Sequence, residues 1–284
     1  LRNYDWLDPI SFYEKSLKYF PYSKKLIHNY GVELLMKYKY EKALIQFKKL
    51  EKQFANSKRE LSKATLGISK SYFMLGNYEE AMKYYIKTLE IDPFNFDALT
   101  GLGLIYERKG DTENCLNFLN KAVQINPYSS PTLYLLGKIY LDKGNYDLAE
   151  KIFIKAIELD PKESIYWNKL GICYFKEGQF DKSLYCFLNA YKFNKNDFLI
   201  ILNLARACQR LNKHNEAIFY FERVFELEPE KTKKNIEILN DYAISLNEIG
   251  EKEKSIEILK KILKIKPDFE PAKINLRIIL QQKK

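Results

Sequence analysis

Four cysteines and two histidines are the side chains of this 284-residue sequence best suited to nucleophilic or metal chemistry. The cysteines lie at positions 115, 173, 186 and 208, and the histidines at positions 28 and 214. No two cysteines form a C-x-x-C pair, and the two histidines lie far apart in the sequence. A protein metal site needs ligands that gather at short, characteristic spacings. We therefore expect no metal site, and we expect no other cofactor.

The sequence also lacks the short motifs of common catalytic sites. It has no G-x-S-x-G elbow, no phosphate-binding loop and no complete dinucleotide fingerprint. Gly101 and Gly103 form a G-x-G, but the third glycine is missing and the segment reads as the middle of a helix. We predict a protein that is not an enzyme and has no catalytic residue.

The segment 165–180, IYWNKLGICYFKEGQF, is the part of the chain that most resembles a site. It combines Trp167 and Cys173 with two glycines and several aromatic residues. Such a group of residues has two interpretations, a place for chemistry or a place for packing. The choice depends on whether the same residue types recur elsewhere at a fixed spacing.

They do recur. Pro93, Pro127 and Pro161 follow one another at intervals of 34 residues, and Pro229 lies twice that distance further on. Within each interval the apolar residues have helical spacing, then a short turn with a glycine, then helical spacing again. A proline after the second helix stops it, because proline disfavours helix in the residue before it. Each interval therefore predicts a helical hairpin.

The hairpin pattern resembles the tetratricopeptide repeat. In the interval 164–197 the residues that carry the resemblance are Trp167, Leu170, Gly171, Tyr174, Gly178, Phe180, Ser183, Phe187 and Ala190, with Lys195 in place of the proline. The resemblance covers most of the chain. It implies an all-α, right-handed α-solenoid (superhelix) of about seven hairpins. In this interpretation the conspicuous residues of 165–180 pack, and Cys173 packs with them.

The 34-residue period predicts how the chain divides into repeats. The division consists of a partial repeat at 1–23, repeats at 24–57, 62–95, 96–129, 130–163, 164–197, 198–231 and 236–269, and a C-terminal capping helix at 270–284. Two insertions of four residues, 58–61 and 232–235, interrupt the period. Four residues add about one helical turn, so we expect each insertion to lengthen a helix. We also expect a polar outer face on the capping helix, as repeat arrays need at their ends.

A small residue recurs eight positions into each repeat, where we expect the first helix to approach the second closely. A bulky side chain there would therefore destabilise the fold. The positions are Gly31, Ser69, Gly103, Gly137, Gly171, Ala205 and Ala243.

The resemblance also implies where a partner binds, because first helices of such repeats line a concave groove. The positions that face this groove are rich in amide, basic and aromatic side chains, which suit an extended peptide. The groove candidates are Lys70, Tyr134, Lys138, Asn168, Ile172, Asn203, Arg206, Gln209 and Arg210. No three consecutive repeats supply the lysine and asparagine set that clamps a C-terminal carboxylate, so we do not predict that subtype.

The main hypothesis is a scaffold that binds another protein or peptide and supports assembly of a complex. A net charge of +10 raises the alternative of an RNA-binding solenoid, but the lysines are scattered among 37 acidic residues, and we do not expect nucleic acid as a partner. A docking region of a larger enzyme and a homo-oligomer are further alternatives. The sequence begins with Leu, and we expect a piece of a longer protein. No apolar run is long enough to span a membrane, and the unpaired cysteines favour the cytoplasm.

Overall fold

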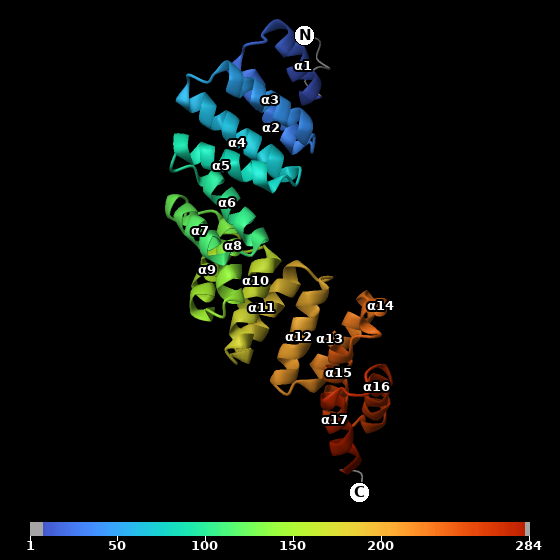
Figure 1. Cartoon of the computed structure of the whole chain (residues 1–284). Coiled ribbons are helices and arrows are strands. Elements are labelled where there is room, and N and C mark those ends of the chain that lie inside the picture. Colours follow the sequence, from blue (N-terminus) through green and yellow to red (C-terminus); the bar gives the residue numbers. More distant parts are fainter. Residues whose placement is uncertain (1–7, 282–284) are drawn as a thin grey trace. The chain divides into compact units, whose positions relative to one another are not determined.

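The computed structural model describes residues 8–281 of the chain. Within these residues the chain forms 17 helices and no strand (Figure 1). The chain divides into two compact parts, an N-terminal part that ends at Thr132 and a C-terminal part that begins at Leu133. The division falls inside one helix, α8 (Ser130–Asp142). The all-helical architecture predicted from the sequence is confirmed.

In the N-terminal part each helix packs against the next along the chain. After α1 the helices alternate between first and second members of a hairpin. Their bounds are α1 (Pro9–Tyr19), α2 (Lys24–Met36), α3 (Tyr40–Gln53), α4 (Lys58–Met74), α5 (Tyr78–Ile91), α6 (Phe96–Lys109) and α7 (Thr112–Ile125).

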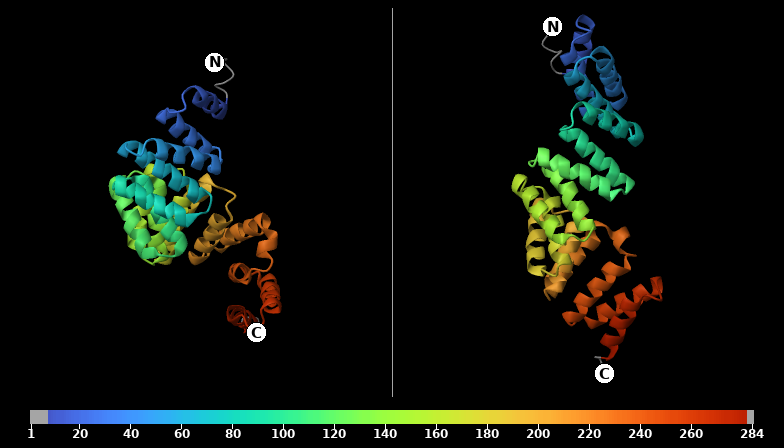
Figure 2. Two further views of the ribbon diagram at one scale, coloured as in Figure 1. Left: turned by 45° about the horizontal axis from the view of Figure 1, so that its top comes forward. Right: turned by 60° about the vertical axis from the view of Figure 1, so that its left-hand side comes forward.

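The C-terminal part continues the alternation (Figure 2). The second helix of every hairpin, from α3 to α16, is 14 residues long. The bounds are α9 (Tyr146–Leu159), α10 (Ser164–Lys176), α11 (Phe180–Phe193), α12 (Phe198–Arg210), α13 (His214–Leu227), α14 (Pro229–Thr232), α15 (Ile236–Glu248), α16 (Lys252–Ile265) and α17 (Glu270–Gln281).

Local sequence signals fix where helices begin and end. Asn95 and Asn145, for example, lie just before α6 and α9, and each side chain accepts a hydrogen bond from a first-turn backbone N–H. The turns between paired helices contain a residue with positive φ. In five turns this is the predicted glycine, with φ between 74° and 88°. Tyr38 and Asn212 take the same conformation, with φ of 59° and 57°.

Close packing inside each hairpin joins a small residue of the first helix to a large one of the second. A Cβ atom built on Gly171 would lie 2.6 Å from two ring carbons of Phe187, and one on Gly137 would lie 2.8 Å from the Phe153 ring. Phe153 and Phe187 are almost completely buried. The predicted close approach at these glycines is confirmed.

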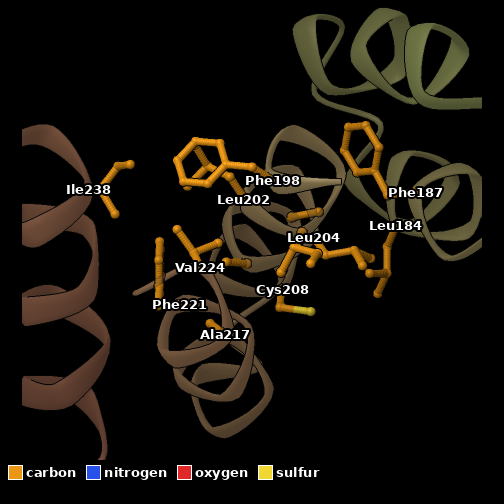
Figure 3. Packing of buried hydrophobic residues seen from close by; sticks show 13 residues of the cluster. Leu184, Phe187, Phe198, Leu202, Leu204, Cys208, Ala217, Phe221, Val224 and Ile238 are labelled. Atoms are coloured by element: carbon orange, nitrogen blue, oxygen red, sulfur yellow. The ribbon is translucent and has the colours of Figure 1, made fainter. Parts of the chain in front are cut away.

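Within the C-terminal part, buried clusters reach across neighbouring hairpins, one from α11 to α15 and another from α15 to α17. Figure 3 shows Phe187 of α11, Leu204 and Cys208 of α12 and Phe221 of α13 in one cluster, with Ile238 of α15 pointing toward it. A hairpin alone leaves one apolar face uncovered, and its neighbour covers that face. Apolar burial across successive repeats therefore holds the stack together.

The two insertions have different outcomes. The first lengthens a helix as predicted, because α4 has 17 residues whereas α2 has 13. For the second the prediction was wrong. Pro229 starts a separate short helix, α14, and residues 233–235 then lead to α15 without helix. Proline suits the first turn of a helix, and Asn235 caps α15 by accepting a hydrogen bond from the Ile238 N–H, so a new helix starts at Ile236.

The last helix is less polar on its outside than predicted. It buries Ala272 and Ile279, but Ile274, Ile278 and Leu280 remain about half exposed. Among residues 8–281, no helix is both long and apolar enough to cross a membrane.

Candidate interaction surface

Polar side chains of neighbouring first helices bond to one another in the C-terminal part. The Asn203 side chain on α12 donates from Nδ2 to Oδ1 of Asn168 on α10, at 2.9 Å. Asn168 is only 7% exposed, so it is less accessible than its repeat position predicts. The two candidates are brought together, and each satisfies part of the hydrogen-bonding capacity of the other.

A second set of bonds joins α12 to α15. Arg206 donates from Nε to Oδ2 of Asp241 at 3.0 Å, and both side chains are partly exposed. Gln209 donates from Nε2 to the backbone carbonyl of Asp241 at 2.6 Å and to Oγ of Ser245 at 2.9 Å. Burial raises the pKa of Asp241, and the Arg206 guanidinium opposes that shift. We call Asn168, Asn203, Arg206, Gln209 and Asp241 the polar face.

A second asparagine pair joins α15 to α17, as Asn168 and Asn203 join α10 to α12. Asn275 on α17 donates from Nδ2 to Oδ1 of Asn240 on α15 at 3.0 Å. Both amide pairs join residues 35 positions apart. Asn275 and Ser245 were not among the predicted candidates. The sequence did contain a signal for Asn275. It is an asparagine in the helix that follows the Asn240 repeat, and it stands one position later in its own repeat than Asn240 does.

Three other candidates have contacts or positions of a different kind. In the N-terminal part, Lys70 forms an ion pair with Asp97 at 2.7 Å. The Tyr134 ring on α8 lies 5.6 Å from the Tyr166 ring, measured between centroids. Lys138 also belongs to α8 and is partly buried.

Two further candidates contact the hydrophobic residues of their own region. Ile172 packs against the core cluster of α11 and α12, and the Arg210 guanidinium lies 5.0 Å from the centroid of the Phe180 ring. Ile172 therefore contributes to the scaffold, whereas Arg210 is exposed and keeps most of its donors in water.

No group of three or more His, Cys, Asp or Glu side chains within residues 8–281 could hold a metal ion. All four cysteines are buried as free thiols. Burial raises the pKa of Cys173 and of Cys186 to about 12 and that of Cys208 to about 11, so these thiols stay protonated and poorly nucleophilic at neutral pH.

The fold and the linked first helices define a class of protein, the helical repeat proteins built from tandem hairpins. Three family models match the chain and together span most of it. They describe subunit 3 of the anaphase-promoting complex or cyclosome, matched at residues 74–156, the tetratricopeptide repeat, matched at 134–197, and YpiA-like C-terminal tetratricopeptide repeats, matched at 199–268. The chain is a tetratricopeptide repeat protein.

Solved structures of tetratricopeptide proteins share the fold. YrrB, described as having an unusual peptide-binding site, is 21% identical, with a TM-score of 0.61 over 68% of this chain and 97% of its own. The C-terminal part of a repeat protein from Cytophaga hutchinsonii is 22% identical, with a TM-score of 0.65 over 88% and 99%. A chain of the Cut9–Hcn1 hetero-tetramer of the anaphase-promoting complex is 18% identical, with a TM-score of 0.60 over 95% and 52%. No curated protein sequence matches the chain.

Proposed function

We propose that the protein is a non-catalytic scaffold that binds an extended segment of a partner protein along the polar face and so supports assembly of a complex. The observation that carries this proposal is the row of amide and guanidinium groups on α10 and α12, which bonds to Asp241 on α15. Amide groups bond to peptide backbone, and a guanidinium bonds to backbone carbonyls or carboxylates. The fold shared with YrrB and with a chain of the Cut9–Hcn1 assembly supports a role in binding peptides or proteins.

Free donors remain on the polar face for a partner. Arg206 uses its Nε atom for Asp241, and its side chain is 36% exposed, which leaves its terminal N–H groups for other acceptors. Arg210 adds an exposed guanidinium on the same helix. Asp241 already neutralises Arg206 in part, so a neutral, carbonyl-rich backbone is a better ligand for this face than a carboxylate cluster. We place this activity in the cytoplasm, a compartment in which the four thiols remain reduced.

The test uses variants that remove both members of a hydrogen-bonded pair, since leaving one buried polar group unpaired destabilises the fold. Asn168→Ala with Asn203→Ala is the polar-face variant. Asn189→Ala with Asn215→Ala is the control, because these two asparagines lie on the second helices α11 and α13. Both variants should keep the helical content of the wild type by circular dichroism.

Each protein is then used for affinity capture from lysate of the source cells, with and without nuclease treatment. We expect the wild type and the control to retain a protein partner that the polar-face variant loses. Equal capture by all three proteins would refute the polar face as the binding surface. Loss of every ligand on nuclease treatment would instead favour an RNA-binding protein.

A further inference from the structure

The second break in the repeat period creates a cavity. Helix α14 lies where the chain passes from α13 to α15 (Figure 1). A cavity of about 310 Å³ opens beside it, lined by residues of α13, α14, α15 and α16 and by Lys233. This volume lies at the lower end of the range for small-ligand sites.

Apolar side chains form most of the cavity wall. They are Phe225 of α13, Leu239 and Tyr242 of α15 and Ile258 of α16. The Tyr242 hydroxyl donates to Oε1 of Glu222 at 3.1 Å, and burial raises the pKa of Tyr242 to about 12, so its ring serves as a neutral surface. Such a wall favours a bulky apolar group from a ligand.

The short helix that frames the cavity is held in place by its own contacts. Thr232 is buried, and its hydroxyl donates to the backbone carbonyls of Glu228 and Pro229 at 2.9 and 3.2 Å. The Lys231 ammonium lies 4.1 Å from the centroid of the Phe198 ring. A cavity with a fixed frame loses less entropy on binding than one that must order itself.

Two lysines belong to the cavity lining. Lys233 and Lys261 both line the cavity, and Lys261 is exposed and forms no ion pair with any described residue. Lys233 is paired with Glu230, and both side chains are more than half exposed. An exposed pair of this kind is worth at most about 1 kcal/mol, so an incoming carboxylate can exchange with Glu230.

We propose that this cavity is a second partner-binding site, which takes a bulky apolar side chain that lies next to a carboxylate in an acidic peptide. The apolar wall binds the side chain, and Lys233 and Lys261 bind the carboxylate. The site goes beyond the polar face, because no residue of that face lines the cavity. A partner that reaches both surfaces has two independent points of attachment.

The probe is N-acetylphenylalanine, whose carboxylate stands next to an aromatic side chain, and N-acetylphenylalaninamide is its neutral counterpart. Binding is followed by the methyl resonance of Ile258 in the full chain labelled at isoleucine methyl groups, with Ile68 of the N-terminal part as an internal reference. We expect the carboxylate probe to shift Ile258 saturably and to leave Ile68 in place. The neutral probe should bind about fivefold more weakly, the effect of an exposed charge pair.

A matched pair of charge variants completes the test. Lys233→Glu with Lys261→Glu should weaken the carboxylate probe at least about fivefold. Lys260→Glu with Lys264→Glu makes the same charge change on exposed residues of α16 that do not line the cavity, and it should leave binding unchanged. The proposal fails if Ile258 does not move, if the two probes bind equally, or if both variants weaken binding alike. None of these outcomes bears on the polar-face capture experiment.

Discussion

At the scale of single residues, the fold depends on a small residue opposite a large one within each hairpin. Gly171 faces Phe187, Gly137 faces Phe153 and Gly103 faces Leu119, with no room for a Cβ atom in any of the three pairs. Ser183 adds a bond to the same contact, because its hydroxyl donates to the carbonyl of Gly171 at 2.9 Å. Cys115 makes the equivalent contact with the carbonyl of Gly103 at 3.1 Å.

We predict that Gly171→Ala lowers the free energy of unfolding by about 1–3 kcal/mol, because the added methyl group overlaps the buried Phe187 ring. Urea denaturation measures the change. Phe187→Leu should partly rescue the variant, since leucine already stands opposite Gly103 at position 119. A stability of Gly171→Ala equal to that of the wild type would contradict this account of the packing.

The thiols give a second prediction at this scale. All four are buried, and burial raises the pKa of Cys173, Cys186 and Cys208 far above neutrality. We expect Ellman's reagent to label none of them within minutes at about pH 7.5 in the native protein and all 4 after denaturation. Rapid labelling of any one thiol in the native state would show that its repeat opens readily.

The sequence predicted the packing residues better than the polar contacts. Gly171 and Phe187 recur at fixed positions, so their roles followed from the period. Asn168 and Asn203 were named as candidates, but their mutual bond was not predicted, because it joins positions that differ by one residue between neighbouring repeats. Such an offset depends on how successive helices are rotated, and periodicity alone does not specify that rotation.

At the scale of the elements, the turns differ in how well their residues suit the backbone. Five turns place a glycine at positive φ, whereas the turn after α2 places Tyr38 there, with φ of 59°. The left-handed conformation costs a non-glycine residue roughly 1–2 kcal/mol. Tyr38 is 78% exposed, and its ring meets Tyr40 edge-on at 6.3 Å.

We predict that Tyr38→Gly raises the free energy of unfolding by about 1 kcal/mol, because it removes the backbone strain at little loss of packing. Tyr38→Ala is the matched control. It loses the same contact with Tyr40 and keeps the strain, so it should not stabilise the protein. Thermal melts of the two variants measure the changes in stability. An equal gain for both would mean that loss of the tyrosine side chain, and not relief of backbone strain, stabilises the protein.

The link between α12 and α15 gives a prediction about pH. Burial raises the pKa of Asp241 above its ordinary value of 3.8, so protonation is more favourable in the folded chain than in the unfolded one. The stability of the wild type relative to Asp241→Asn should therefore increase as the pH falls from about 7 through the raised pKa, and level off below about pH 3.8. Urea denaturation of both proteins across this range measures the difference. A difference that is constant, or that shifts toward the variant at low pH, would contradict a raised pKa for Asp241.

The insertions show why element boundaries were harder to predict than element types. Both insertions have four residues, yet the first lengthens α4, whereas the second contributes only Thr232 to the short helix α14 and is not helical at residues 233–235. The local sequences differ, because Pro229 starts α14 just before the second insertion, and Asn235, the last residue of that insertion, caps α15. Capping residues, and not the length of an insertion, decided the outcome.

At the scale of the whole molecule, burial is unevenly distributed along the chain. Helix α12 has eight buried residues, α17 has two, and α1 has none. Each repeat contacts its neighbours along the chain, and among residues 8–281 α1 packs against α2, whereas α17 packs against α15 and α16. The repeat period predicted that successive repeats stack on one another, but it did not predict how much apolar surface α17 leaves exposed.

We predict that amide hydrogen exchange is slowest in α12 and fastest in α1 and α17, by at least about tenfold, because local opening at an end exposes little buried surface. Exchange followed by mass spectrometry on peptic fragments measures the gradient. Uniform protection from α1 to α17 would mean that the chain opens only as a single unit.

The contacts that hold the repeats together join residues close in the sequence, and this affects how the chain folds. The small–large pairs inside hairpins join residues 16 positions apart, and the hydrogen bonds between repeats reach 36 positions. Contacts this local require little loop closure, which favours fast folding. Each hairpin can therefore form soon after it leaves the ribosome and provide an apolar surface for the next one. Folding of this chain would then follow its synthesis, repeat by repeat, without waiting for the C-terminus.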